Sequence, residues 1–87
     1  MKWSKYTIEM LGVTIDCWES RVNGRAYRVT NVSNGVAHLG IFATVKCGRR
    51  WPLFIEPKRL ARSDGACSPF EFDTISAAKS ACRECEK

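Results

Sequence analysis

The residues of this chain best suited to chemistry are basic side chains that crowd into its middle. From Arg21 to Arg62 nine lysines and arginines stand against the single acid Glu56, while the flanks carry five basic and eight acidic residues. Guanidinium groups bind phosphate or carboxylate through paired hydrogen bonds, so this stretch should attract nucleic acid or an acidic protein surface. The candidate binding residues are Arg25, Arg28, Lys46, Arg49, Arg50, Trp51, Lys58, Arg59 and Arg62.

Aromatic side chains are interleaved with this basic stretch, at Trp18, Tyr27, Phe42 and Trp51. Unpaired bases stack on such groups, and arginine beside aromatic residues is also typical of the energetic centres of protein interfaces. A third interpretation places Trp18 and Tyr27 in the core and leaves the arginines as a solvated charged face. Nucleic acid, an acidic protein surface and a plain solvated face therefore all remain open.

Cys82 and Cys85 form the only pair with a spacing typical of a metal site. Zinc takes four ligands in a tetrahedron, and two thiolates separated by two residues commonly supply half of them. On a helix, however, both would fall on an apolar stripe, where a free cysteine packs as a small hydrophobe. We expect a structural role and no cofactor, with a zinc-stabilised protein as an alternative. The remaining ligands would have to come from Cys17, Cys47, Cys67 or His38.

The residues that usually carry out acid–base catalysis are few and dispersed in this sequence. His38 is the only histidine, and the strand pattern points it away from the face of Leu39 and Ile41, beside Phe42. The six glycines lie at predicted turns rather than in a phosphate-binding loop. We therefore expect no enzyme and no small-molecule substrate. The acids that could form a catalytic pair are dispersed, at Asp16, Glu19, Glu56 and Asp64.

Short strands joined by turns must position the basic residues. The strongest hairpin signal is Asn23-Gly24, because both positions of its turn need positive φ, and it sets Trp18 opposite Val29. Strands are predicted from apolar and β-branched residues at Tyr6–Leu11, Val13–Val22, Arg25–Val32, Val36–Cys47, Trp51–Glu56 and Phe70–Phe72. In the long fourth strand, alternation predicts that Ala37, Leu39, Ile41, Ala43 and Val45 face the core.

One amphipathic helix closes the predicted fold. Asp73 or Thr74 can cap its first free N–H groups, and Phe72 can pack back onto the first turn. Its apolar stripe would contain Ile75, Ala78, Ala81, Cys82 and Cys85. The sequence therefore predicts an α+β fold, an antiparallel meander of four to five strands with one C-terminal helix packed on a sheet face.

The length of the chain, 87 residues, suits a single domain spanning 1–87. No apolar run resembles a secretory signal or approaches the roughly 18 residues of a membrane span, so we expect a cytoplasmic protein without a membrane partner. The stretch Pro57–Pro69 is predicted to be a loop, and loops of this length in small domains are usually functional or mobile.

From Phe70 to Cys82 the sequence F-E-F-D-T-I-S-A-A-K-S-A-C resembles the ends of many small proteins encoded by bacteriophages and prophages. Strands followed by a helix are also similar to the arm-type domains of phage integrases and the plant AP2 domain, whose motif residues are missing here. A common role of small phage proteins is inhibition of host defence, as in the anti-CRISPR class.

The resemblance implies a compact, non-catalytic binding protein that blocks a nucleic-acid-handling host complex by occupying its surface. We expect that contact surface to centre on Arg49, Arg50, Trp51, Lys58, Arg59 and Arg62, because positive charge is concentrated there beside a turn and a loop. A direct DNA- or RNA-binding module that uses the same arginines is the alternative.

Overall fold

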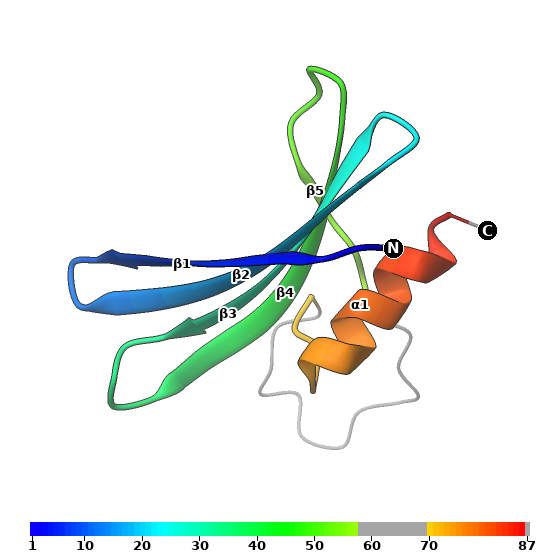
Figure 1. The fold of residues 1–87 in the computed structure, drawn as a ribbon. Coiled ribbons are helices and arrows are strands. Elements are labelled where there is room, and N and C mark those ends of the chain that lie inside the picture. Colours follow the sequence, from blue (N-terminus) through cyan, green and yellow to red (C-terminus); the bar gives the residue numbers. More distant parts are fainter. Residues whose placement is uncertain (58–69, 87) are drawn as a thin grey trace.

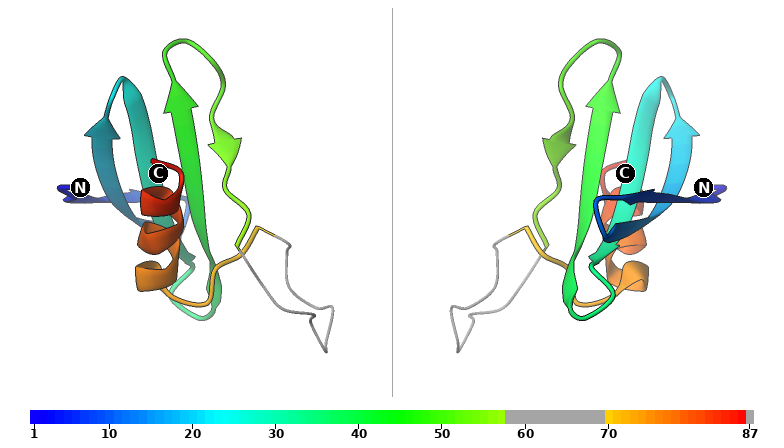
Figure 2. Two further views of the ribbon diagram at one scale, coloured as in Figure 1. Left: turned by 90° about the vertical axis from the view of Figure 1, so that its right-hand side faces the viewer. Right: turned by 90° about the vertical axis from the view of Figure 1, so that its left-hand side faces the viewer.

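A computed structural model of the chain describes residues 1–57 and 70–86. Five antiparallel strands follow one another across a single sheet in the order β1-β2-β3-β4-β5 (Figure 1). One helix, α1, crosses one face of the sheet, and the other face carries no described element (Figure 2). The α+β meander with a C-terminal helix is thus confirmed. The elements are β1 Ser4–Met10, β2 Val13–Val22, β3 Arg25–Ser33, β4 His38–Cys47, β5 Leu53–Phe54 and α1 Ile75–Glu84.

Turn chemistry sets the register of the first three strands. Asn23 and Gly24 have φ values of 51° and 79°, as the predicted hairpin turn requires. Trp18 pairs with Val29 and Ser20 with Tyr27, which confirms the predicted register. Leu11 and Gly12 form a similar two-residue turn between β1 and β2, with Leu11 at a φ of 51°. The predicted strand Tyr6–Leu11 therefore ends one residue too late, because Leu11 belongs to the turn.

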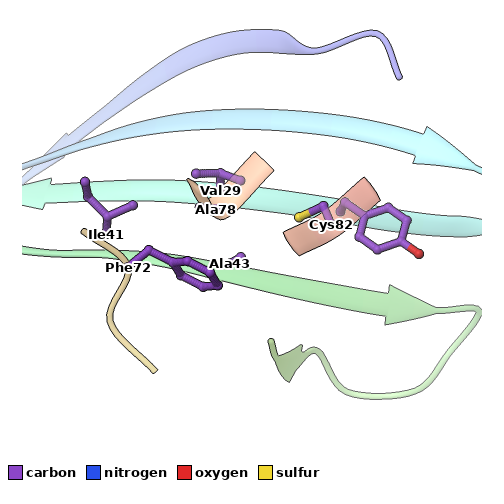
Figure 3. Close-up of a cluster of buried hydrophobic side chains, with 7 residues drawn as sticks. Val29, Ile41, Ala43, Phe72, Ala78 and Cys82 are labelled. Carbon is purple, nitrogen blue, oxygen red and sulfur yellow. The ribbon is translucent and has the colours of Figure 1, made fainter. Parts of the chain in front are cut away.

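The core lies between α1 and the facing side of β3 and β4, hereafter the covered face of the sheet. Tyr27, Val29 and Ala43 are completely buried there, and Ala78 and Cys82 close the core from the helix (Figure 3). Small residues on the helix let its axis approach the sheet, so the β3 side chains fill the space between the two layers. The predicted apolar stripe of the helix is confirmed at Ala78 and Cys82.

The helix begins where the sequence indicated. Thr74 is the N-cap, and its hydroxyl oxygen accepts a hydrogen bond from the Ala77 N–H at 3.0 Å. The predicted strand Phe70–Phe72 is wrong, because no strand of the described sheet includes these residues. The Phe72 N–H donates to the Ile41 carbonyl oxygen at 2.8 Å, and this bond and the buried Phe72 ring fix the entry to the helix.

The start of β4 also differs from its prediction. A register shift after Val32 sets Gly40 opposite Val32 but His38 opposite Ser33, so Leu39 bulges out and is 49% exposed. The bulge changes the alternation, and Ala37 and Leu39 do not face the core. Gly40 is required here: it has a φ of 153°, and a Cβ would lie 2.6 Å from the Phe42 ring.

The bulge also moves His38. Its Nε2 lies 2.6 Å from the Asn31 side-chain oxygen, and Asn31 pairs with the core residue Ile41. The imidazole is therefore on the covered side of the sheet, beyond the helix, and not beside Phe42 as the alternation predicted.

The last strand is shorter than predicted. β5 contains only Leu53 and Phe54, after which the Ile55 N–H donates to the Ala43 carbonyl oxygen at 2.9 Å. Pro52 has no N–H to give to a ladder, and it stands just before the paired residues.

Candidate binding surface

Two turns with basic residues meet at one end of the sheet. The β2–β3 turn and the connection from β4 to β5 lie side by side in both orientations (Figures 1 and 2). Ala26 pairs with Arg21 on one side and Lys46 on the other, so these two cations flank it on one face. A shallow hollow of about 270 Å³ lies between the turns. Its lining residues are Arg21, Gly24, Arg25, Ala26, Lys46 and Gly48.

The β4–β5 connection adds the most exposed part of this surface. Gly48 takes a φ of 56°, and the Arg50 N–H donates to the Cys47 carbonyl oxygen at 3.1 Å, which closes the turn. Arg49 and Arg50 are exposed, and Trp51 is 88% exposed. An indole left in water beside two guanidinium groups can stack on a planar group or anchor an interface. We call Arg21, Lys46, Arg49, Arg50 and Trp51 the basic end.

Within the residues that the structure describes, no acid lies within ion-pair distance of Lys46, Arg49 or Arg50. Arg21 lies 3.7 Å from Glu19, an exposed contact of small energetic weight. The basic end therefore presents its positive charge to solvent with little internal compensation.

Arg25 has a different role from the one its charge suggested. Its Nη1 donates to the Glu86 carboxylate at 3.0 Å, Asn23 Nδ2 donates to the same group at 3.1 Å, and the Tyr27 hydroxyl donates to it as well. Hydrogen bonds from Tyr27 and Arg25 lower the pKa of Glu86. Burial and the bond to Glu86 raise the pKa of Tyr27 to about 12. Glu86 thus ties the C-terminal end of α1 to the β2–β3 hairpin.

Arg28 is also engaged inside the molecule. It lies directly opposite Glu19 in the β2–β3 ladder, with Nη2 3.5 Å from the carboxylate, which also accepts a bond from the Tyr6 hydroxyl at 3.2 Å. The remaining predicted binding residues, Lys58, Arg59 and Arg62, lie outside the described residues. Of the predicted set, the structure places Arg25 and Lys46 on the lining of one hollow, together with Arg21. Arg49, Arg50 and Trp51 are exposed in the connection that follows β4.

The aromatic residues divide between core and surface. Tyr27 is buried, and Trp18 packs against the core with Lys79 Nζ 5.4 Å from its ring centroid. Both belong to the covered face, as the third interpretation of the sequence proposed, and the half-buried Trp18 has the Nζ atoms of Lys5 and Lys79 over its ring. Phe42 and Phe54 lie on the opposite face with their ring centroids 6.1 Å apart, and Phe54 is 55% exposed.

The face away from the helix, hereafter the open face, was not singled out by the sequence. Pairing aligns Ile8, Ile15 and Val32 across three strands, and Tyr6 beside Cys17 in the next row. The side chains of this face come from even-numbered positions in β1 and β3 and from odd-numbered positions in β2. That signal was present in the sequence, but one helix can cover only one of two apolar faces.

The two cysteines with metal-like spacing are separated by their environments. Cys82 is buried in the core, where burial raises the pKa of its thiol to about 12, whereas Cys85 caps the helix and is exposed. The prediction that both pack on the apolar stripe holds for Cys82 and is wrong for Cys85. Among the described residues no three His, Cys, Asp or Glu side chains gather as metal ligands would.

A second hollow lies between α1 and the segment after β5. It has a volume of about 420 Å³ and a mainly apolar floor. The apolar part of the lining is formed by Ile55, Pro57, Phe72, Ala77 and Ala81. The polar part of the lining is formed by Glu56, Asp73, Ser80, Glu84 and Cys85.

Comparison with known proteins returns no matching family model, no matching curated protein and no matching solved structure. Within residues 1–57 and 70–86, no helix has the length and apolar character needed to cross a membrane.

Proposed function

We propose that this protein is a non-catalytic binding protein that inhibits a nucleic-acid-handling complex by occupying its surface with the basic end. The observation that carries the proposal is the hollow lined by Arg21 and Lys46, next to the connection that carries the exposed Arg49, Arg50 and Trp51. A cationic surface is complementary to an acidic patch on such a complex, and a protein that occupies that patch can block the action of the complex. The proposed role is that of the anti-CRISPR kind of phage inhibitor, acting in the host cytoplasm.

Two features support binding over chemistry. Arg21 and Lys46 both lie in strands and flank Ala26 across the β2–β3 and β3–β4 ladders, so the sheet sets their spacing, and Arg49 and Arg50 follow in the β4–β5 connection. An arginine pair beside an exposed tryptophan has the composition of an interface hot spot.

A second candidate is direct binding of DNA or RNA. The exposed Trp51 beside Arg49 and Arg50 favours it, because base stacking on an aromatic side chain beside phosphate-binding arginines holds single strands without sequence preference. In this case affinity must fall steeply with salt, since each phosphate contact releases a counterion.

The experiment that separates the two is an anisotropy titration of short labelled single- and double-stranded DNA and RNA at about 50 mM and about 200 mM salt. A complex at low salt that weakens by orders of magnitude at high salt establishes the second candidate. The absence of binding at low salt, from a folded protein, supports a protein target.

The protein target is then tested by capture from a nuclease-treated bacterial lysate. The double variant R49E/R50E is compared with K2E/R83E, which makes the same change in net charge at exposed positions outside the basic end. Capture of a nucleic-acid-handling complex by the wild type and K2E/R83E but not by R49E/R50E supports the proposal. Equal capture by both variants contradicts it.

A further inference from the structure

The strand β1 leaves one side of its backbone available for pairing. It is an edge strand of the described sheet, with β2 as its single neighbour, and it runs for seven residues without a bulge (Figure 1). The pair Met10 and Val13 closes a two-residue turn, and such a closing pair exchanges hydrogen bonds. Ladder bonds then alternate, so Lys5, Thr7 and Glu9 direct their N–H and carbonyl groups away from β2.

An edge of this kind is a template for another strand. Natural edges are usually protected by charges, a proline or a bulge, and β1 has no proline. Its only charges are Lys5 and Glu9, of opposite sign and symmetric about Thr7. Whether they protect the edge depends on what lies across from them.

Antiparallel pairing of β1 with a second β1 about a two-fold axis at Thr7 makes this strand self-complementary. Thr7 then meets Thr7 of the second copy, and Lys5 meets Glu9 of the second copy twice, once on each side of the axis. Opposite charges directly across a ladder stabilise the pair. All three outward-facing residues become hydrogen-bonded pairs in this register.

Other registers lose this match. A slip of one residue places side chains of opposite faces across from each other, and a slip of two places Lys5 or Glu9 opposite Thr7 without a charge partner. The charges of β1 therefore select one antiparallel register, whereas a parallel pair would set lysine beside lysine.

The open face is also continued by this pairing. Tyr6 lies opposite Ile8 of the second copy, so the apolar row of Ile8 and Ile15 in one molecule runs into Tyr6 and Cys17 of the other. The turn residue Leu11, which is 99% exposed in one molecule, comes beside the first residues of the second copy. Edge pairing thus reduces the exposed apolar surface at the β1–β2 end, where the helix gives no cover.

We propose that two copies of this chain form an isologous dimer by antiparallel β1–β1 pairing centred on Thr7. The two sheets then become one continuous sheet with both helices on the same side, and the two basic ends point to opposite ends of the assembly. The dimer rests on β1 and the charges of Lys5 and Glu9, so it is independent of what the basic end binds.

The test is sedimentation velocity of the full chain in reducing buffer, over concentrations from about 1 µM to about 500 µM. The wild type is expected to shift from monomer to dimer within this range. K5E and E9K each place like charges opposite each other and should weaken dimerisation about tenfold or more. The double variant K5E/E9K restores opposite charges in the same register and should recover most of that loss.

A second variant tests the backbone contact. In T7P the missing N–H belongs to the outward side of β1, so the β1–β2 ladder is preserved while pairing across the axis is blocked. T7P should remain monomeric at all concentrations with a wild-type far-UV circular dichroism spectrum. A wild type that stays monomeric, or a K5E/E9K variant no better than its single variants, overturns the proposal.

Discussion

The two faces of the sheet have similar apolar content but different surroundings. On the covered face, Tyr27 and Val29 are sealed by Ala78 and Cys82 of α1. On the open face, Tyr6, Val32 and Phe54 have the same residue character but stay partly in water. The difference shows that the pattern of apolar residues determines where strands form, while the one helix determines which face becomes a core.

The comparison also separates stability from recognition. Side chains of the covered face are expected to contribute most of the folding free energy. Burial stabilises the folded chain by about 25 cal/mol for each Å² of apolar surface withdrawn from water. The basic end and β1 bury little apolar surface and therefore add little to the folding free energy. Their exposed groups can serve binding without a loss of stability. Matched substitutions on the two faces test this division.

The largest expected effect is at the buried tyrosine. Tyr27→Ala removes a completely buried ring and one donor to Glu86, and it should cost about 3–5 kcal/mol of unfolding free energy. Tyr6→Ala, the matched change on the open face, should cost about 1 kcal/mol because that ring is already partly hydrated. Urea denaturation of both variants measures the difference. Equal losses would mean that the open face is also a closed core.

A smaller effect of the same kind is expected within one strand. Val29 and Val32 are both in β3 but on opposite faces, and only Val29 is completely buried. Val29→Ala should cost about 2–3 kcal/mol and Val32→Ala about 1 kcal/mol or less. The order is checked by thermal unfolding, and a reversed order would place the core on the wrong side of the sheet.

The bond between helix and hairpin should be visible as a pH dependence. Because the pKa of Glu86 is lowered in the folded chain, its contribution is present above the unfolded pKa and is lost as pH falls through the folded pKa. Wild type should therefore be more stable than Glu86→Gln at neutral pH, and the gap should narrow on acidification. Unfolding midpoints at neutral and acid pH measure both gaps. A gap that does not change with pH would show that the charge of Glu86 is not involved.

Local chemistry made part of this fold predictable. Asn23-Gly24 fixed its own turn, and through it the β2–β3 register, because the required φ values are a property of those two residues. The residue types at the start of the helix limited the cap to Asp73 or Thr74, and helical spacing predicted the apolar stripe that buries Ala78. These features depend on neighbours only a few residues away.

Features that depend on distant parts of the chain were not predictable. The bulge at the start of β4 places His38 on the covered side and leaves Leu39 exposed, which simple alternation cannot indicate. Arg25 was expected to bind a partner, but it meets Glu86, which is 61 positions away. Cys85 was predicted on the apolar stripe but is exposed, because the helix ends at Glu84 and Cys85 is its C-cap.

The candidate site shows the same contrast. The concentration of arginine in the middle of the chain was evident, and Arg49, Arg50 and Trp51 do stand exposed together. The contribution of Arg21 was missed, because only the cross-strand pairing through Ala26 brings it to Lys46. Arg28 was included for its charge, and the ladder sets it against Glu19.

The most direct test of the basic end is retention on a heparin column, with R49E/R50E compared to K2E/R83E. Both variants change the net charge equally, and both alter exposed side chains, so each should keep its unfolding free energy within about 0.5 kcal/mol of wild type. If the basic end is the polyanion-binding surface, R49E/R50E should elute at far lower salt than wild type, and K2E/R83E close to wild type. Equal losses of retention would show that net charge alone is responsible, and they would contradict the account.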